Sequence, residues 1–209
     1  MIGIEVNAKQ LTALREAVSK SKKSFGKELA KTVNKVAKQT VKELSSAKTG
    51  IPQHINIKPT DVKKLITVKP RATESNPVAE FSIAWTKRPG LQYFGAKQNS
   101  GGVNYRMSKK GKSTFIAGAF MGPRPGVLAP SLNGGVFIRR GEKRKMTKGR
   151  YQGKVKQPIV KLRGASVAGV FVKNKMDEPT TAFIKTQLDK EMARAIRENV
   201  LRANGLIPK

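Results

Sequence analysis

Cysteine is absent from this chain of 209 residues, and histidine and acidic residues are scarce. Without cysteine the protein has no disulfide, no thiolate nucleophile and no thiolate metal ligand. Histidine occurs once, and 13 acidic residues stand against 43 lysines and arginines. No apolar run approaches the ~20 residues that a membrane-spanning helix needs, and the first ten residues lack the layout of a secretory signal. We therefore expect a protein that stays in a cytosol-like compartment.

The residues that catalysis requires do not form a recognisable set in the sequence. His54 stands beside Ile55 in a predicted strand, where packing explains it better than catalysis, and no third residue orients a nucleophile beside it. The acidic residues are scattered, and Asp177-Glu178 is better explained by the start of a helix. Gly111-Lys112-Ser113 lacks the correctly placed upstream glycine of a phosphate-binding P-loop. The sequence therefore predicts a protein that is not an enzyme and uses no cofactor or metal ion.

Positive charge is what the chain has in excess, with a formal net charge of +30. Residues 87–163 hold 19 of the lysines and arginines and one acidic residue, Glu142. Like charges at this density repel one another, and an isolated domain gains nothing from that repulsion. A polyanion, either nucleic acid or an acidic protein surface, is therefore the expected partner. Both long helices are too rich in alanine and valine for a membrane-binding face, so no membrane partner is expected.

Helical periodicity predicts an N-terminal helix over residues 8–47 and a C-terminal helix over 177–204. Asn7 precedes the first helix and Gln10 follows three residues later, which is the spacing of a capping box. Gly26 and the Ser/Lys cluster before it mark a place where this helix could kink or split. Pro179 stands early in the second helix, where the missing amide hydrogen costs nothing, and Asn204-Gly205 ends it.

Strand-like alternation occurs at several places between the two helices, and it is strictest over Ala79–Trp85. Further strands are expected at Ile2–Val6, Ile55–Ile57, Leu65–Val68, Phe94, Val103–Met107, Phe115–Met121 and Gly135–Arg139. Short helices are expected over Asp61–Lys64, capped by Thr60 or Asp61, and over Ser166–Val172.

The connections between these strands are basic and rich in glycine. Lys109-Lys110-Gly111-Lys112 is predicted to be the tip of a hairpin, because glycine supplies the turn and the lysines stay in water. Pro123–Gly135 contains three prolines and three glycines and predicts a loop. Arg140–Lys156 has no apolar periodicity and predicts a long, mobile loop. Together the patterns predict one α+β domain over residues 1–209. In it a small antiparallel sheet with long basic loops, over 51–165, is flanked by a long N-terminal helix and a C-terminal helix.

The candidate binding residues are the cations of these loops, which suit contact with phosphate oxygens or with an acidic partner surface. They are Lys109, Lys110, Lys112, Arg139, Arg140, Lys143, Arg144, Lys145, Lys148 and Arg150. Arg139 also ends a predicted strand and could be tied into the fold. Five aromatic residues of the chain are too few and too sheet-like for a single-strand stacking platform: Trp85, Tyr93, Phe94, Tyr105 and Tyr151. Contact with DNA is therefore expected to be insensitive to sequence.

Several short runs follow one another in a fixed order along the middle of the chain. They are Phe94-Gly95-Ala96-Lys97-Gln98, Gly102-Val103, Ile116-Ala117-Gly118-Ala119-Phe120, Val136-Phe137-Ile138-Arg139, Gly141, Lys143-Arg144, Pro158-Ile159 and Gly164-Ala165-Ser166-Val167. In this order, and with helices on either side, the chain resembles the minor tail protein Z family of tailed bacteriophages, also called tail completion proteins. It departs from the family pattern where Met146–Gln157 separates the basic run from Pro158-Ile159.

The resemblance implies a structural virion protein of the phage tail or neck. Such a protein completes the head-proximal end of the tail for head-tail joining and for positioning of the genome. The resemblance also implies a homo-oligomeric ring, a hexamer if it matches the tail tube, which contacts tail terminator, tail tube or neck proteins and lies close to genomic DNA. The protein would be made in the host cytoplasm. The alternative is a free basic protein that binds nucleic acid without sequence preference, and the ordered apolar runs favour the assembly interpretation over it.

Overall fold

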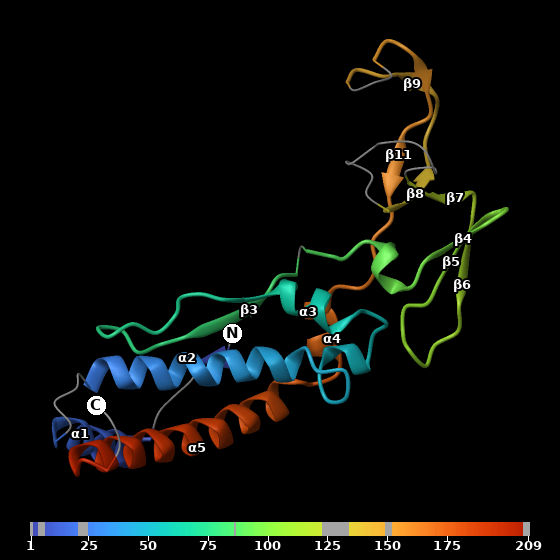
Figure 1. The fold of residues 1–209 in the computed structure, drawn as a ribbon. Helices are drawn as coiled ribbons and strands as arrows, with labels where there is room; N and C mark the ends of the chain where they lie inside the picture. The colour runs from blue at the N-terminus through green and yellow to red at the C-terminus, as the bar shows by residue number, and fades with distance from the viewer. Residues whose placement is uncertain are drawn as a thin grey trace.

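A long helical body and a β-rich projection at one of its ends make up the fold (Figure 1). The computed structural model describes residues 2–3, 7–20, 25–85, 87–122, 134–148 and 152–206. We call the described residues of 2–85 and 164–206 the helical body and those of 87–163 the projection. The predicted α+β class is confirmed, because five helices combine with small antiparallel sheets.

Three helices run side by side through the body: α1 (Ala8–Lys20), α2 (Phe25–Leu44) and α5 (Asp177–Ala203) (Figure 1). Two helices stand where one was predicted over 8–47, which agrees with the split indicated near Gly26, and the second helix ends at Leu44 and not at residue 47. Both helices pack on α5. Residues 177–204 form the helix predicted for them, and Gly205 follows it with a φ of +73°.

Apolar stripes on the three helices meet in the core of the body. Ile184, Leu188 and Met192 of α5 are at most 3% exposed, and they belong to one cluster with Leu14 and Val33. Burying each such side chain contributes about 1.5–3 kcal/mol. The apolar residues that recur every four positions on α5 therefore form the face that packs against the other helices.

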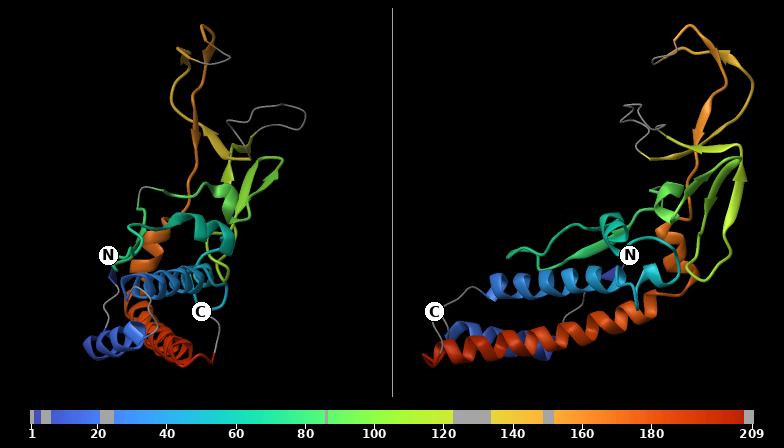
Figure 2. Two further views of the ribbon diagram at one scale, coloured as in Figure 1. Left: turned by 60° about the vertical axis from the view of Figure 1, so that its left-hand side comes forward. Right: turned by 45° about the vertical axis from the view of Figure 1, so that its right-hand side comes forward.

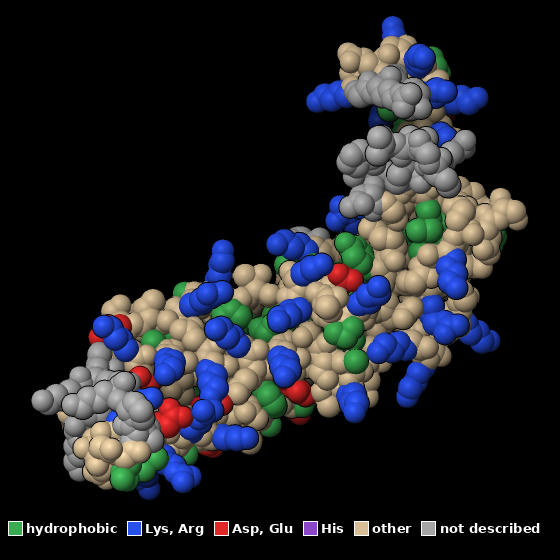
Figure 3. Space-filling view, viewed as in Figure 1, with side chains coloured by type: hydrophobic (Ala, Val, Ile, Leu, Met, Phe, Trp, Pro, Cys, Tyr) green, Lys and Arg blue, Asp and Glu red, His purple; other side chains and the backbone are tan. Residues whose placement is uncertain are grey.

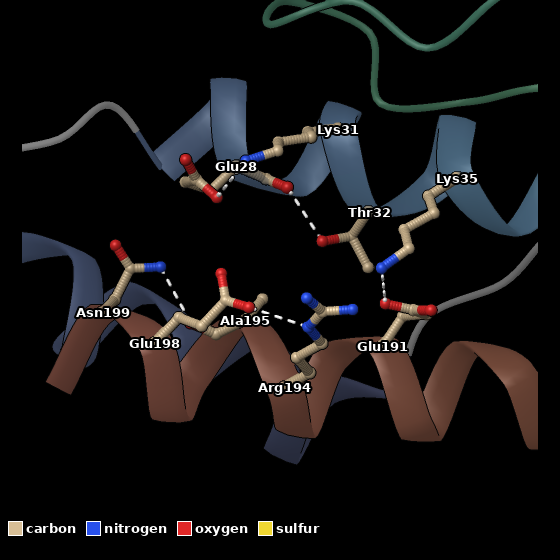
Figure 4. Close-up of polar contacts among 9 residues, drawn as sticks. All are labelled: Glu28, Lys31, Thr32, Lys35, Glu191, Arg194, Ala195, Glu198 and Asn199. Atoms are coloured by element: carbon tan, nitrogen blue, oxygen red, sulfur yellow. Dashed lines mark hydrogen bonds and ion pairs between the residues drawn. The ribbon is translucent and has the colours of Figure 1, made fainter. Parts of the chain in front are cut away.

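A polar seam joins α2 to α5 beside this core (Figure 4). Glu191 is 7% exposed, and its carboxylate accepts hydrogen bonds from Lys35 Nζ at 2.5 Å and from Gln39 Nε2 at 2.9 Å. Burial raises the pKa of Glu191, but the hydrogen bonds from Lys35 and Gln39 and the charges of Lys35 and Arg194 outweigh it. The pKa of Glu191 is therefore lowered, and the side chain is a buried carboxylate held ionised by its partners.

The start of α1 shows which part of the predicted capping box forms. Asn7 Oδ1 accepts a hydrogen bond from the Lys9 amide at 2.9 Å, so the cap is confirmed. Gln10 does not reach back to complete the box. Its Nε2 donates instead to Asp189 Oδ1 on α5, at 2.7 Å. Gln10, which the sequence predicted as part of the helix cap, thus takes part in the contact between α1 and α5.

A three-stranded antiparallel sheet lies along α2 and completes the body (Figures 1 and 2). Its strand order is β1 (Ile2–Gly3), β3 (Glu80–Ile83) and β2 (Ile66–Val68). The side chain of Asn34 on α2 donates to the carbonyl of Ala72 at 2.8 Å and accepts from its amide at 3.1 Å. This pair of hydrogen bonds fixes the connection between β2 and β3 onto the helix.

Short helices link the body to the projection: η1 (Ile51–Gln53), α3 (Pro59–Leu65) and α4 (Val167–Lys173). The helices predicted near 61–64 and 166–172 are confirmed, but Lys58, and not Thr60 or Asp61, is the cap residue of α3 because Pro59 opens the helix. The strand predicted at Ile55–Ile57 is wrong. Both isoleucines are buried in the turn after η1, which shows that their alternation reflected burial and not a sheet.

The projection contains three further small sheets in place of the single sheet predicted (Figure 2). One sheet contains β4 (Lys97–Asn99), β5 (Gly102–Tyr105) and β6 (Thr114–Ala117). A second contains β7 (Ala119–Met121), β8 (Val136–Arg139) and β11 (Ile159–Lys161). The third is a hairpin of β9 (Arg144–Lys145) and β10 (Val155–Lys156).

Three predictions for the projection need correction. The run Phe115–Met121 is two strands in different sheets, because Gly118 adopts a φ of +68° between them. Phe94 lies in the 3-10 helix η2 (Leu91–Phe94) and not in a strand. Part of Arg140–Lys156, predicted to be loop throughout, pairs as the β9–β10 hairpin. The tip predicted at Lys109–Lys112 does connect two paired strands, β5 and β6. Most of the loop predicted over Pro123–Gly135 lies outside the described residues.

The projection is closed at its base by a short antiparallel crossing of the chain. Gly90 and Arg163 form a β-bridge, and the Gly164 amide donates to the Pro89 carbonyl at 2.8 Å. Phe94 is fully buried beside this crossing, and a Cβ added to Gly164 would collide with its ring. Residues 91–162 therefore leave the body and return to it at one point.

Replacing Lys35→Met is expected to lower the free energy of unfolding by about 2 kcal/mol at pH 7, because the buried Glu191 carboxylate loses its cation. The folded-state pKa of Glu191 is lowered, so the contribution of the pair is present above the unfolded pKa of about 4.3. It is lost as pH falls through the folded-state pKa. Urea unfolding at several pH values measures both effects. The control is Lys38→Met, an exposed lysine of the same helix. A gap between wild type and Lys35→Met that is as wide at pH 3 as at pH 7 would contradict this account.

Candidate polyanion interface

Acidic residues lie almost entirely in the helical body, whereas basic residues occur in both parts of the structure. The helical body contains 21 basic and 11 acidic residues, a net charge of +10. The projection contains 17 basic residues and one acidic residue, a net charge of +16. Figure 3 shows acidic side chains gathered over the helices, whereas lysines and arginines cover both parts of the molecule. The positive charge of the projection is therefore almost uncompensated by acidic residues within its described part.

The described residues of 139–156 form the end of the projection, which we call the basic arm (Figure 1). Its predicted site residues are all exposed in the structure: Arg139, Arg140, Lys143, Arg144, Lys145 and Lys148. Arg150 lies outside the described residues. In the β9–β10 hairpin Lys156 stands directly opposite Arg144. Like charges directly opposite each other destabilise a strand pair unless other groups compensate for them.

Arg139 differs from the other residues of the arm. Its guanidinium lies 5.6 Å from the centre of the Phe120 ring, which in turn stacks on Phe137 at a centroid distance of 6.0 Å. A cation–π contact of this kind contributes about 0.5–1 kcal/mol at an exposed position. Arg139 thus helps to hold β8 against β7, as its place at the end of the strand predicted.

The lysines of the β5–β6 tip do not join the arm. Figure 2 shows that the connection between β5 and β6 returns toward α4, away from the β9–β10 hairpin. Lys110 lines a hollow of about 520 Å³ together with His54 of the body and Lys173 of α4. Lys109 and Lys112 are exposed on the same tip. The nine predicted residues that the structure describes therefore belong to two separate surfaces and not to one site.

A third group of cations was missed by reasoning from the sequence. Lys87, Arg88 and Arg163 line a cavity of about 240 Å³ at the base of the projection, where Lys64 of α3 joins them. The bridge between Gly90 and Arg163 brings the two segments together although they lie far apart in the chain. Local patterns gave no signal for this pairing, since it is a long-range contact between two turns.

Groups suited to other chemistry do not assemble in the described ranges. No three histidine, cysteine or acidic side chains there come close enough to hold a metal ion. Asp61, the acidic residue of the cavity, forms an ion pair with Lys64 at 3.3 Å. Across the same ranges no helix is both long and apolar enough for a bilayer. The exposed lysines and arginines of these surfaces are suited to binding anions.

Apolar side chains of the projection are also left uncovered. Ile159 and Val160 of β11 are each 43% exposed, and successive strand residues point to opposite faces of a sheet. Neither face of the β7–β8–β11 sheet is therefore fully covered along this strand. Phe115 of β6 is 51% exposed. The projection thus exposes large apolar side chains in two of its sheets, and such side chains can contribute to a contact surface where they are contiguous.

Comparison with protein-family models, with curated proteins and with solved structures gives no match, so no relative assigns a role to any of these residues.

Replacing Lys143, Arg144 and Lys145 together by glutamine is expected to reduce the salt dependence of DNA binding. If the arm contacts phosphates, the slope of log K against log salt should fall in magnitude by roughly two to three, because each contact contributes about 0.9. All duplex sequences should be weakened equally. Fluorescence anisotropy at several salt concentrations measures the slope.

The control variant replaces Lys38, Lys42 and Lys48 of the body by glutamine, which removes the same charge from exposed positions elsewhere. A loss of slope that is equal in both variants would show that only the net charge matters. An unchanged slope, together with normal particle assembly, would leave the arm as solvated surface.

Proposed function

We propose that this chain is a structural, non-enzymatic protein of a phage tail or neck, which completes the head-proximal end of the tail for head-tail joining and genome positioning. The ordered runs between Phe94 and Val167 supply the resemblance to tail completion proteins. The observation that carries the proposal is the uncovered apolar surface of the projection, which is typical of a subunit within an assembly.

The total surface of the chain supports an assembly role. Its accessible area is 13,929 Å², whereas a compact protein of 22.8 kDa exposes about 9,600 Å². The excess of about 4,000 Å² reflects an elongated shape, which leaves more surface for contact with neighbouring subunits than a compact domain has. An elongated body with a projecting sheet region places that surface where neighbouring subunits can reach it.

A closed ring is the simplest arrangement for such a subunit. One heterologous contact, repeated around an axis, uses two different surfaces of every copy and closes when the rotation fits. Sixfold closure would match a tail tube. The net charge of +30 opposes association of free copies, so the ring would form on a tail terminator, tail tube or neck protein, and the arm would face genomic DNA or an acidic neighbour.

The second candidate function is that of a free basic protein that binds nucleic acid without sequence preference. Lys143, Arg144 and Lys145, all exposed on the arm, favour it, since cations of this kind suit contact with a phosphate backbone. This candidate does not explain the uncovered apolar residues of β11, which a phosphate backbone would not cover. The assembly role accounts for both observations.

Cryo-electron microscopy of purified particles and sedimentation of the isolated protein together test the proposal. The isolated protein is expected to sediment as a monomer or a weak oligomer, because its charge repels other copies. In particles its density should form a ring at the head-proximal end of the tail. Density confined to the capsid shell or the baseplate would refute the proposal, and so would a chain missing from particles and bound to cellular nucleic acid.

A further inference from the structure

The cavity at the base of the projection combines apolar walls with a rim of cations. Leu65, Pro89 and Tyr93 form apolar walls, and Tyr93 is 44% exposed. The ring belongs to η2, not to a sheet as the sequence indicated. The Tyr93 amide donates to the Gly90 carbonyl at 3.1 Å, so the backbone that carries the ring is fixed to the crossing. An exposed aromatic ring on a fixed backbone offers a flat surface for a planar ligand.

Three of the four cations of the rim form no ion pair within the described part of the chain. Lys87, Arg88 and Arg163 are exposed, and no ion pair within the described ranges includes them. Lys64 is the exception, because Asp61 binds it at 3.3 Å. Two of the three unpaired cations are arginines, whose planar guanidinium groups bind phosphate oxygens in pairs. The rim is therefore built to hold an anion beside the aromatic ring.

We propose that this cavity binds one nucleotide of a single-stranded nucleic acid, with its base on the Tyr93 ring and its flanking phosphates on Lys87, Arg88 and Arg163. Stacking of a base on an aromatic side chain next to a cationic surface is the usual way in which proteins hold single strands. The volume of about 240 Å³ equals that of about eight water molecules in the liquid. A cavity of this size suits one nucleotide and not several stacked bases.

Two other occupants fit the cavity less well. A base within a duplex is already stacked and paired, so it cannot cover Tyr93, and a duplex would use only the cations. An acidic peptide would satisfy the cations but has no planar group for the ring. The inference does not rest on the proposed tail function, because it concerns residues outside the basic arm and holds for either candidate function.

Fluorescence anisotropy with a short labelled thymidine oligonucleotide and a short labelled duplex tests the proposal on the full chain. Tyr93→Ala is expected to weaken binding of the single strand about thirtyfold, the middle of the range for one stacked base. Its effect on the duplex should stay within about twofold. Tyr93→Phe keeps the ring and should bind as wild type. Phe115→Ala removes a similarly exposed aromatic residue outside the cavity and serves as the matched control.

The charge contacts are tested separately from the ring. Arg88→Gln and Arg163→Gln should each lower the salt slope for the single strand by about 0.7, the value for one contact on single-stranded nucleic acid. Their unfolding curves should match that of wild type, because both side chains are exposed.

Three results would overturn the proposal. One is single-strand affinity that is unchanged by Tyr93→Ala. Another is an equal loss for single strand and duplex, or for Tyr93→Ala and Phe115→Ala. The third is competition by a short polyglutamate peptide as effective as that by unlabelled oligonucleotide, which would identify an acidic peptide as the occupant. None of these results would alter the expected place of the chain in particles, so the two proposals fail independently.

Discussion

The crossing at Gly90 and Arg163 is the constraint on which the rest of the structure depends. The chain between these residues leaves the body and returns to it. Backbone hydrogen bonds join its two ends, and the ring of Phe94 is buried beside them. Gly164 allows this closure because a side chain there would meet that ring. With the base fixed, the body folds around its own core of three helices, and the projection carries surface that the body does not use.

Separation of the two parts also explains how the chain tolerates its charge. Acidic side chains such as Glu191 and Glu198 lie in the body, where they pair with Lys35 and Arg194. Because these ion pairs are local, they do little to offset the cations of the arm, which lie at the far end of the projection (Figure 3). A bound polyanion would reduce the repulsion among the cations of the arm. The same excess of cations at the base of the projection surrounds an aromatic ring, which gives that cavity a different ligand preference.

The long helices could be predicted from the sequence because their signals are local and repeated. The stripe that includes Ile184, Leu188 and Met192 placed α5 almost to the residue. Predictions failed where long-range contacts decide the structure. Ile55 and Ile57 alternate in the sequence because both side chains are buried in the core from a turn. Gln10 does not cap its own helix, because its side chain donates a hydrogen bond to Asp189 on another helix.

The candidate surfaces also include features that the sequence predicted and features that it could not predict. The exposure of the basic arm followed from its composition, because side chains of that charge density remain in water unless they are paired. The separation of Lys110 from the arm could not be foreseen, since it depends on which way the β5–β6 hairpin turns. The cavity around Tyr93 depends on the contact between residues 90 and 163, which no periodicity records.

The central claim is that the projection is a subunit surface that is completed only in an assembly. Hydrogen–deuterium exchange of the backbone amides of β7, β8 and β11, in the free chain and in purified particles, tests it most directly. The account predicts rapid exchange in these short, uncovered strands of the free chain and strong protection in particles, with little change in the core of α5. Equal protection of the three strands in both states would contradict it.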